Sequence, residues 1–116
     1  METLENCENY RCILRQIIEK HAGLMARRSP GVDVLPLCNR EYDSYMILRV
    51  GWDMTGRVHY IMLHLRLRNE GKICIEFDGI EYGIQHDLLE AGIPESDICF
   101  AENEPQSESL PQLLAA

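Results

Sequence analysis

The chain has 116 residues, 46% of them apolar, and a formal net charge of −8, which fits one domain with an ordinary core that needs neither disulfides nor a structural metal. The first residues lack the basic start and apolar run of a signal peptide, no stretch approaches the roughly 18 apolar residues of a membrane span, and the five cysteines lack paired spacing. We therefore expect a soluble, cytoplasmic protein with reduced thiols, which excludes the secreted, membrane and fibrous classes.

An amphipathic helix is predicted from Leu4 to Leu24. Apolar and semi-apolar residues recur there every three or four positions, which places them along one side of a helix. Ser29, Pro30 and Gly31 follow, and these turn residues end helical order. The stripe consists of Leu4, Cys7, Tyr10, Leu14, Ile17, His21 and Leu24.

Four strands are predicted after the helix, because short runs rich in β-branched and aromatic residues alternate with turn residues. The connections between them are only a few residues long, which requires antiparallel neighbours and thus a meander. The predicted strands are Val32–Cys38, Ser44–Trp52, Arg57–Arg68 and Lys72–Phe77.

Successive side chains of a strand point to opposite faces of a sheet. In the third and fourth runs, alternation directs one apolar set toward the helix: Ile61, Leu63, Leu65, Leu67, Ile73, Ile75 and Phe77. One long helix covers only one face, so we expect the second face to be open. The set predicted on this second face is Tyr60, Met62, His64, Arg66, Arg68, Lys72, Cys74, Glu76 and Asp78.

A short second helix is predicted over Ile84–Ala91, where apolar residues share one side and Gly92 ends the pattern. Ile98–Phe100 offers a brief extended piece. Residues 101–116 are acidic, contain proline and lack aromatic residues, so we expect a mobile tail there. The predicted architecture is a single α+β domain over residues 1–100, in the order α-β-β-β-β-α, with a four-stranded antiparallel meander sheet.

Charge is divided unevenly along the chain. All eleven Lys and Arg lie within residues 1–72 beside nine acids, a charge of +2, whereas residues 73–116 carry ten acids and no Lys or Arg, a charge of −10. Because affinity for the phosphate backbone comes mainly from clustered Lys and Arg, we expect no direct nucleic-acid binding. The acidic part is either a solvated surface or a face that meets a basic partner.

The sequence lacks closely spaced metal ligands. Cys7 and Cys12 are five residues apart and fall on different sides of the helix, while His59 and His64, also five apart, alternate to opposite sides of a strand. A structural zinc site usually takes its four ligands as two close pairs. We therefore expect no metal site and no cofactor.

One weak catalytic pattern is present. Glu76, Asp78 and Lys72 share one side of a predicted strand, and two acids with a lysine can serve metal-dependent phosphate cleavage. The same residues also fit an ordinary solvated strand face with cross-strand ion pairs to Arg66 and Arg68. No serine lies in the motif of a hydrolase nucleophile. We favour a protein that is not an enzyme, with a metal-dependent phosphate-cleaving enzyme as the alternative.

Candidate partner-binding residues are chosen from the predicted surface, since aromatic residues, Met and Arg are enriched at protein interfaces. The open sheet face suits a partner or a second copy of the chain, and the acidic part suits a basic partner. Trp52 ends a strand, where the alternative is a place at the rim of the core. The candidates are Trp52, Tyr60, Met62, His64, Arg66, Arg68, Glu81 and Glu90.

Four segments carry a family resemblance: NYRCILRQII from residue 9, VGWD at 50–53, RVHYIMLHLRLRNEGKICIEFDG from residue 57, and above all DGIEYGIQHDLLEAGIPESDI at 78–98. In their order and spacing, residues 9–100 resemble the XisI-like family, the excision controlling factors first associated with the fdxN element of heterocyst-forming cyanobacteria. The tail AENEPQSESLPQLLAA departs from the family, whose members commonly end with Arg and aromatic residues around a proline.

The resemblance implies a small α+β protein that controls site-specific DNA excision beside a separate recombinase, without catalysis of its own. Family members are often encoded beside XisH-like proteins, which look like endonucleases. The implied partners are therefore an XisH-like protein and a site-specific recombinase, and an antitoxin-like inhibitor of a nuclease is the alternative role. No catalytic residues can be transferred from the family. A further alternative, which depends on the open sheet face and not on the resemblance, is a structural homodimer.

Overall fold

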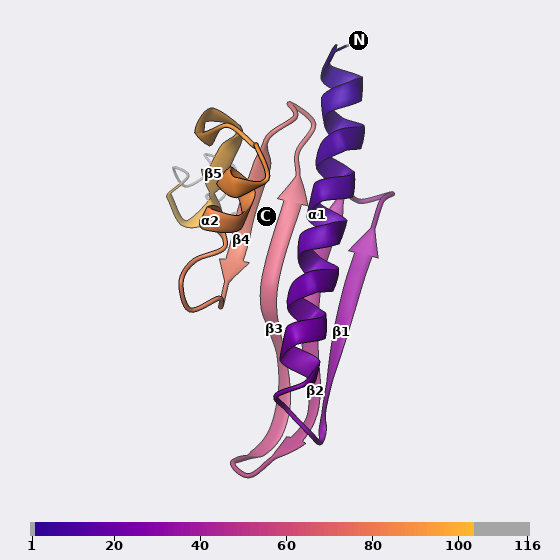
Figure 1. The fold of residues 1–116 in the computed structure, drawn as a ribbon, viewed down its shortest axis with the longest axis vertical. Coiled ribbons are helices and arrows are strands. Elements are labelled where there is room, and N and C mark those ends of the chain that lie inside the picture. Colours follow the sequence, from indigo (N-terminus) through magenta and orange to yellow (C-terminus); the bar gives the residue numbers. More distant parts are fainter. Residues whose placement is uncertain (1, 104–116) are drawn as a thin grey trace, which may run out of the picture.

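The computed structural model describes residues 2–103 of the chain, with the side chains of residues 7–102. A long helix lies along one face of a five-stranded sheet, and a short helix lies beside it (Figure 1). Within the described residues no helix is long and apolar enough to cross a membrane. The elements are α1 (Glu2–Ala26), β1 (Val32–Asn39), β2 (Ser44–Asp53), β3 (Gly56–Leu67), β4 (Ile73–Asp78), α2 (Gln85–Glu90), η1 (Glu95–Asp97), β5 (Ile98–Phe100) and η2 (Ala101–Asn103).

The first four strands form the predicted meander. β1 to β4 pair antiparallel in chain order, and each strand begins and ends within one residue of its prediction. The expectation of a sheet with only four antiparallel strands is wrong, because Ile98–Phe100 pairs parallel with β4 as a fifth strand. The segment between β4 and β5 contains α2 and is long enough for the crossover that parallel neighbours need.

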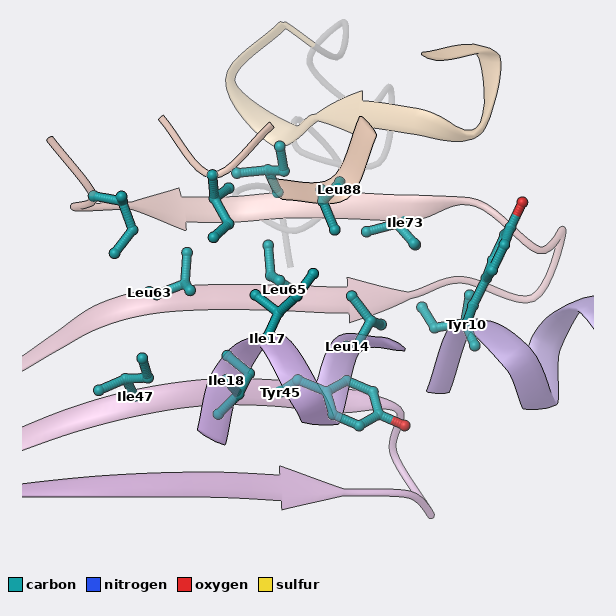
Figure 2. Packing of buried hydrophobic residues seen from close by; sticks show 14 of the residues in the cluster. Tyr10, Leu14, Ile17, Ile18, Tyr45, Ile47, Leu63, Leu65, Ile73 and Leu88 are labelled. Carbon is teal, nitrogen blue, oxygen red and sulfur yellow. The ribbon is translucent and has the colours of Figure 1, made fainter. Parts of the chain in front are cut away.

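The hydrophobic core lies between the sheet and the two helices (Figure 2). Leu14 and Ile18 of α1, Leu63 and Leu65 of β3, and Leu88 of α2 are all fully buried in it. Burial of one such side chain contributes about 1.5–3 kcal/mol. This packing holds both helices on the same side of the sheet. Among residues 2–103, no α-helix covers the other side of β1 to β4.

A β-bulge in β3 changes which of its side chains face the helices. Ile47 pairs with Leu63, but Leu48 pairs with Ile61, so Met62 is an extra residue without a partner on β2. Such an insertion shifts the alternation of faces along the strand. Met62 packs against the core, whereas Ile61 is exposed on the opposite face. The expectation that Ile61 faces the helix and Met62 faces away is wrong for this reason.

A second bulge lies in β4, where Glu76 has no partner on β3. Phe77 pairs with His64 and lies on the face away from α1, so the expectation that Phe77 belongs to the core is wrong. Beyond the bulge, Asp78 pairs with Leu63, whose side chain is buried under the helices. The expectation that Glu76 and Asp78 share one face is therefore wrong as well.

The described chain ends beside β4. Residues Ala101–Asn103 form a 3-10 turn that contacts this strand. The first three residues of the expected mobile tail thus form an ordered turn, and residues 104–116 lie outside the described residues.

Candidate functional site

The face of β1 to β4 that points away from α1 carries two rows of mostly apolar side chains, and we term it the open face. The strand register places Leu35 of β1, Leu48 of β2 and Ile61 of β3 side by side as the first row. Because alternate residues of a strand share a face, the second row lies directly beside the first. The second row is Leu37, Met46, His64 and Phe77.

Solvent reaches much of the apolar surface on these rows. Leu35, Leu37, Ile61 and Phe77 are each 39–49% exposed. Single exposed apolar residues are normal, but a contiguous group on one flat face is typical of an interaction surface. The open face is therefore one candidate functional site.

Polar groups of the open face are held by neighbours on the sheet. The Ser44 hydroxyl and His64 Nε2 lie 2.8 Å apart, and Arg66 Nη1 lies 3.9 Å from Glu76 Oε2. Burial lowers the pKa of His64, an effect that Glu76 opposes and Arg66 reinforces. The lowered pKa favours the neutral imidazole, so the two rows carry no charged side chain at neutral pH.

Two aromatic candidates lie on the hairpin that joins β2 and β3. Trp52 is 65% exposed, and the Arg57 guanidinium lies 5.7 Å from the centre of its ring, so Trp52 is not a rim residue of the core. Tyr60 pairs with Arg49, whose Nη2 donates a 2.9 Å hydrogen bond to Ser29 Oγ just after α1. Tyr60 therefore lies on the helix side of the sheet, and the expectation that it belongs to the open face is wrong.

The other sheet candidates are divided between surroundings. His64 and Arg66 lie on the open face, Met62 packs against the core, and Arg68 follows β3 and lies 3.4 Å from Glu70. The apolar residues that make up most of the open face were not among the candidates. The alternation of side chains along the first two predicted strands could have identified the members on β1 and β2. In β3 and β4 the bulges interrupt this alternation, so the sequence alone does not show which residues face outward. The residues missed are Leu35, Leu37, Met46, Leu48, Ile61 and Phe77.

The remaining candidates, Glu81 and Glu90, lie on a second surface, which we term the α2 patch. Both acids are exposed, and Tyr82 and Leu89 between them expose 60% and 43% of their surface. The rings of Tyr82 and His86 meet edge to face at 6.1 Å, and His86 Nε2 lies 3.4 Å from Glu90. The α2 patch, made of these five residues, thus combines acidic groups with exposed apolar surface.

Asp78 shapes the loop that presents this patch. Its two carboxylate oxygens accept the backbone N–H groups of Ile80 at 3.0 Å and Ile84 at 2.9 Å. Asp78 is thus a turn-forming residue, and it does not converge with Glu76 on a catalytic centre. Within the described residues no three His, Cys, Asp or Glu side chains are grouped so that they could hold a metal ion.

A buried polar contact anchors Tyr82, and sequence reasoning missed it. The Tyr82 hydroxyl donates a 3.0 Å hydrogen bond to Asp87, which also contacts His21 of α1. Burial tends to raise the pKa of Asp87, but the hydrogen bonds from His21 and Tyr82 outweigh it, and the pKa lies below its ordinary value. His21 was predicted only as a member of the apolar stripe of α1, and no local pattern links it to a residue 66 positions away.

A hollow between α1 and β1 gathers basic side chains, but each has an acidic partner. Arg11 Nε lies 2.8 Å from Asp43, Arg15 Nε lies 3.0 Å from Glu19, and Arg40 contacts Glu8. The Arg11 guanidinium holds the pKa of Asp43 below its usual range. The hollow therefore offers guanidinium groups whose charge is already compensated.

Comparison with known proteins agrees with the fold. The family described as XisI protein matches residues 1–112. The fdxN element excision controlling factor XisI from Anabaena variabilis, known from a crystal structure, is 34% identical, with a TM-score of 0.70 over 89% of this chain and 95% of that one.

A second solved structure, a XisI-like protein from Anabaena variabilis, is 20% identical and covers 85% of this chain and 89% of that one with a TM-score of 0.77. At this identity the likeness concerns the fold alone. No curated protein sequence matches the chain. The match to the family across nearly the whole sequence establishes that the chain belongs to the XisI family.

Proposed function

We propose that this chain is a non-enzymatic regulatory protein that controls site-specific excision of a DNA element. The observation that carries the proposal is the 34% identity to an excision controlling factor over 89% of this chain and 95% of that one. The regulatory role is exerted by binding a protein that handles DNA, either an XisH-like protein or a site-specific recombinase.

The α2 patch supports a basic protein as the partner. Glu81 and Glu90 are exposed on it, and the whole of residues 73–116 contains no Lys or Arg. Lys20 of α1 lines one hollow with Asp87 and Glu90, where the acids are in excess. An excess of charge of one sign accelerates association with a partner of the opposite sign. Exposed Tyr82 and Leu89 add apolar surface that a partner can cover, which supplies affinity that charge alone does not.

The arginine pairs between α1 and β1 support a protein partner over direct contact with DNA. Phosphate binding gains affinity when cations release the counterions of the backbone. Arg11 and Arg40 both contact Glu8, and Arg11 also pairs with Asp43. A duplex would have to displace these carboxylates before it gained the contacts, which makes the hollow a poor phosphate site.

Co-purification of the tagged chain from its native cytoplasm at two salt concentrations tests the proposal. We expect an XisH-like protein or a recombinase to be retained at about 50 mM salt and largely lost at about 500 mM, because salt screens charges on an exposed surface. The double variant Glu81→Lys and Glu90→Lys should weaken the complex at least about tenfold.

A matched control separates the patch from net charge. Glu19→Lys with Glu41→Lys changes the net charge equally at exposed positions on the β1 side of the molecule, and it should leave the complex intact. Equal loss in both double variants would overturn the role of the α2 patch. Capture of no DNA-handling protein at low salt would overturn the partner-binding proposal itself. Nuclease assays of the captured partner, with and without the chain, then separate activation from antitoxin-like inhibition.

A further inference from the structure

We propose that the open face joins two copies of this chain, sheet against sheet, about a two-fold axis. The proposal goes beyond the regulatory role, because it concerns self-association on the side of the sheet opposite α2. It leaves the α2 patch on the outside of the dimer, where a second protein can reach it.

The two rows of the open face provide the apolar centre that such an interface needs. Leu48 lies in the middle, with Leu35 on one side and Ile61 on the other, and the second row is directly adjacent. Two sheets pack face to face when side chains of both inner faces interdigitate, about 10 Å apart and within about 30° of parallel. In a two-fold arrangement both copies use the same surface, so one apolar set is sufficient for both partners.

The distribution of charge favours a second copy over a basic protein at this face. The chain carries a net charge of −8, so two copies repel unless they meet where acids are scarce. The rows themselves hold no charged residue. Glu76 beside them is paired with Arg66, and Asp33, the acid that β1 adds to this face, lies near its corner at the start of the edge strand. A basic partner would find no acidic excess here, whereas the same face of another copy meets no like charge at its centre.

The dimensions of the face also match a second sheet. β1 and β2 pair over eight residues. At about 3.4 Å per residue and about 4.8 Å between strands, β1 to β3 span on the order of 400 Å2 in projection. β4 adds mainly Phe77, because Cys74 of β4 is fully buried. Protruding side chains expose more than the projection, so two copies would bury on the order of 1,000 Å2 in total, the lower end of the range for a specific interface. A helix is only about 10 Å wide and would leave part of the face uncovered.

Sedimentation equilibrium of the purified full chain tests the proposal without any partner protein. We expect the mass of two 13.4 kDa chains at micromolar concentration. Leu48→Asp in the first row and Leu37→Asp in the second row should each raise the dimer dissociation constant at least about a hundredfold, since each buries an unpaired carboxylate on both copies. Leu37 is on the edge strand β1, so its variant is expected to keep the fold even where Leu48→Asp does not.

Leu89→Asp is the matched control, because Leu89 on α2 has the same exposed fraction as Leu37, 43%. This control should remain a dimer with an unchanged dissociation constant, and circular dichroism should show that the variants are folded. A wild-type chain that sediments as a monomer would overturn the proposal. A dimer that survives Leu37→Asp but dissociates in Leu89→Asp would also overturn it and would place self-association at the α2 patch. Because no partner takes part, these results do not depend on the regulatory role.

Discussion

His21 Nε2 of α1 lies 2.5 Å from Asp87 Oδ2 of α2, and both side chains are buried. The second oxygen of Asp87 accepts the hydroxyl of Tyr82, so the carboxylate is satisfied from both sides. This contact joins the long helix to the short one across 66 positions of sequence. A helix of only six residues has little stability of its own, so contacts of this kind determine where α2 lies.

Removal of the imidazole should loosen the attachment of α2. His21→Ala leaves the Asp87 carboxylate with one hydrogen-bond partner fewer in a buried place, which costs about 2–3 kcal/mol of unfolding free energy. His86→Ala is the control, because His86 is exposed on the same helix and should change stability by less than about 0.5 kcal/mol. Urea unfolding of both variants checks this, and equal losses would show that the buried contact is not the cause.

The carboxylate of Asp87 should also give the protein a pH dependence in acid. Its pKa is lower in the folded state than its ordinary value of 3.8, so the stability it contributes is complete above about pH 4 and is lost as pH falls through the folded pKa. Asp87→Asn removes the titrating group. The stability difference between wild type and variant should therefore shrink between pH 5 and pH 2 in urea unfolding experiments, and a difference that stays constant would contradict this account.

Local pattern predicted most of the fold. The three-to-four spacing from Leu4 to Leu24 predicted α1 to within two residues at each end, and turn residues between apolar runs predicted β1 to β4. Both signals depend on neighbours in sequence, which is why they suffice. β5 has only three residues, too few for a repeating alternation, and its pairing with β4 depends on a crossover through α2.

The surfaces were harder to predict because they depend on register. Met62 and Glu76 are single extra residues, and each reverses which side chains of its strand point toward the helices. Ile61 and Phe77 therefore lie on the open face and not on the core side. No residue type in these runs marks a bulge. The acidic character of the α2 patch, in contrast, followed from composition, since charge counts need no register.

Two glycines should respond in opposite directions to alanine. Gly23 lies inside α1, and a methyl group added there would meet no atom within 4 Å apart from its chain neighbours and the backbone of the helix itself, so Gly23→Ala should stabilise the protein by about 0.5–1 kcal/mol. Gly51, in the VGWD segment, has φ +151°, and an added Cβ would lie 2.3 Å from the carbonyl oxygen of Gly31. Gly51→Ala should lower the free energy of unfolding by about 2 kcal/mol or more. Thermal unfolding checks both, and stabilisation by Gly51→Ala would contradict the close approach.

The cysteines should react with thiol reagents in an order set by burial. Cys74 is fully buried, and burial, with hydrogen bonds to Cys99 and Glu76, raises its pKa to about 12. Because the thiolate is the reactive form, Cys74 should resist a disulfide reagent at pH 8 until the protein unfolds. Cys12 is exposed and should react in the native state. Mass spectrometry of the labelled protein identifies the cysteines that have reacted. Cys12→Ala is the control, and it should remove one equivalent of rapidly reacting thiol. Labelling of Cys74 before the protein unfolds would contradict its burial.

Tyr10 should make the protein sensitive to alkali. Its hydroxyl donates a 2.5 Å hydrogen bond to Asp97, and burial together with this bond raises the pKa of Tyr10 to about 12. An unfolded tyrosine ionises near pH 10, so the stability that Tyr10 contributes is complete below about pH 10 and is lost as pH rises to about 12, by about 2–3 kcal/mol. Tyr10→Phe lacks the ionisable group, and its unfolding free energy should fall less steeply across this interval. At pH 7 the same variant should lower the free energy of unfolding by about 1 kcal/mol, because it loses the hydrogen bond to Asp97.

Tyr42→Phe is the control, because the Tyr42 ring is 71% exposed. Its free energy of unfolding should fall with pH as steeply as that of the wild type. Urea unfolding from pH 9 to pH 11.5 measures both variants, and equal slopes against pH would refute the assignment to Tyr10.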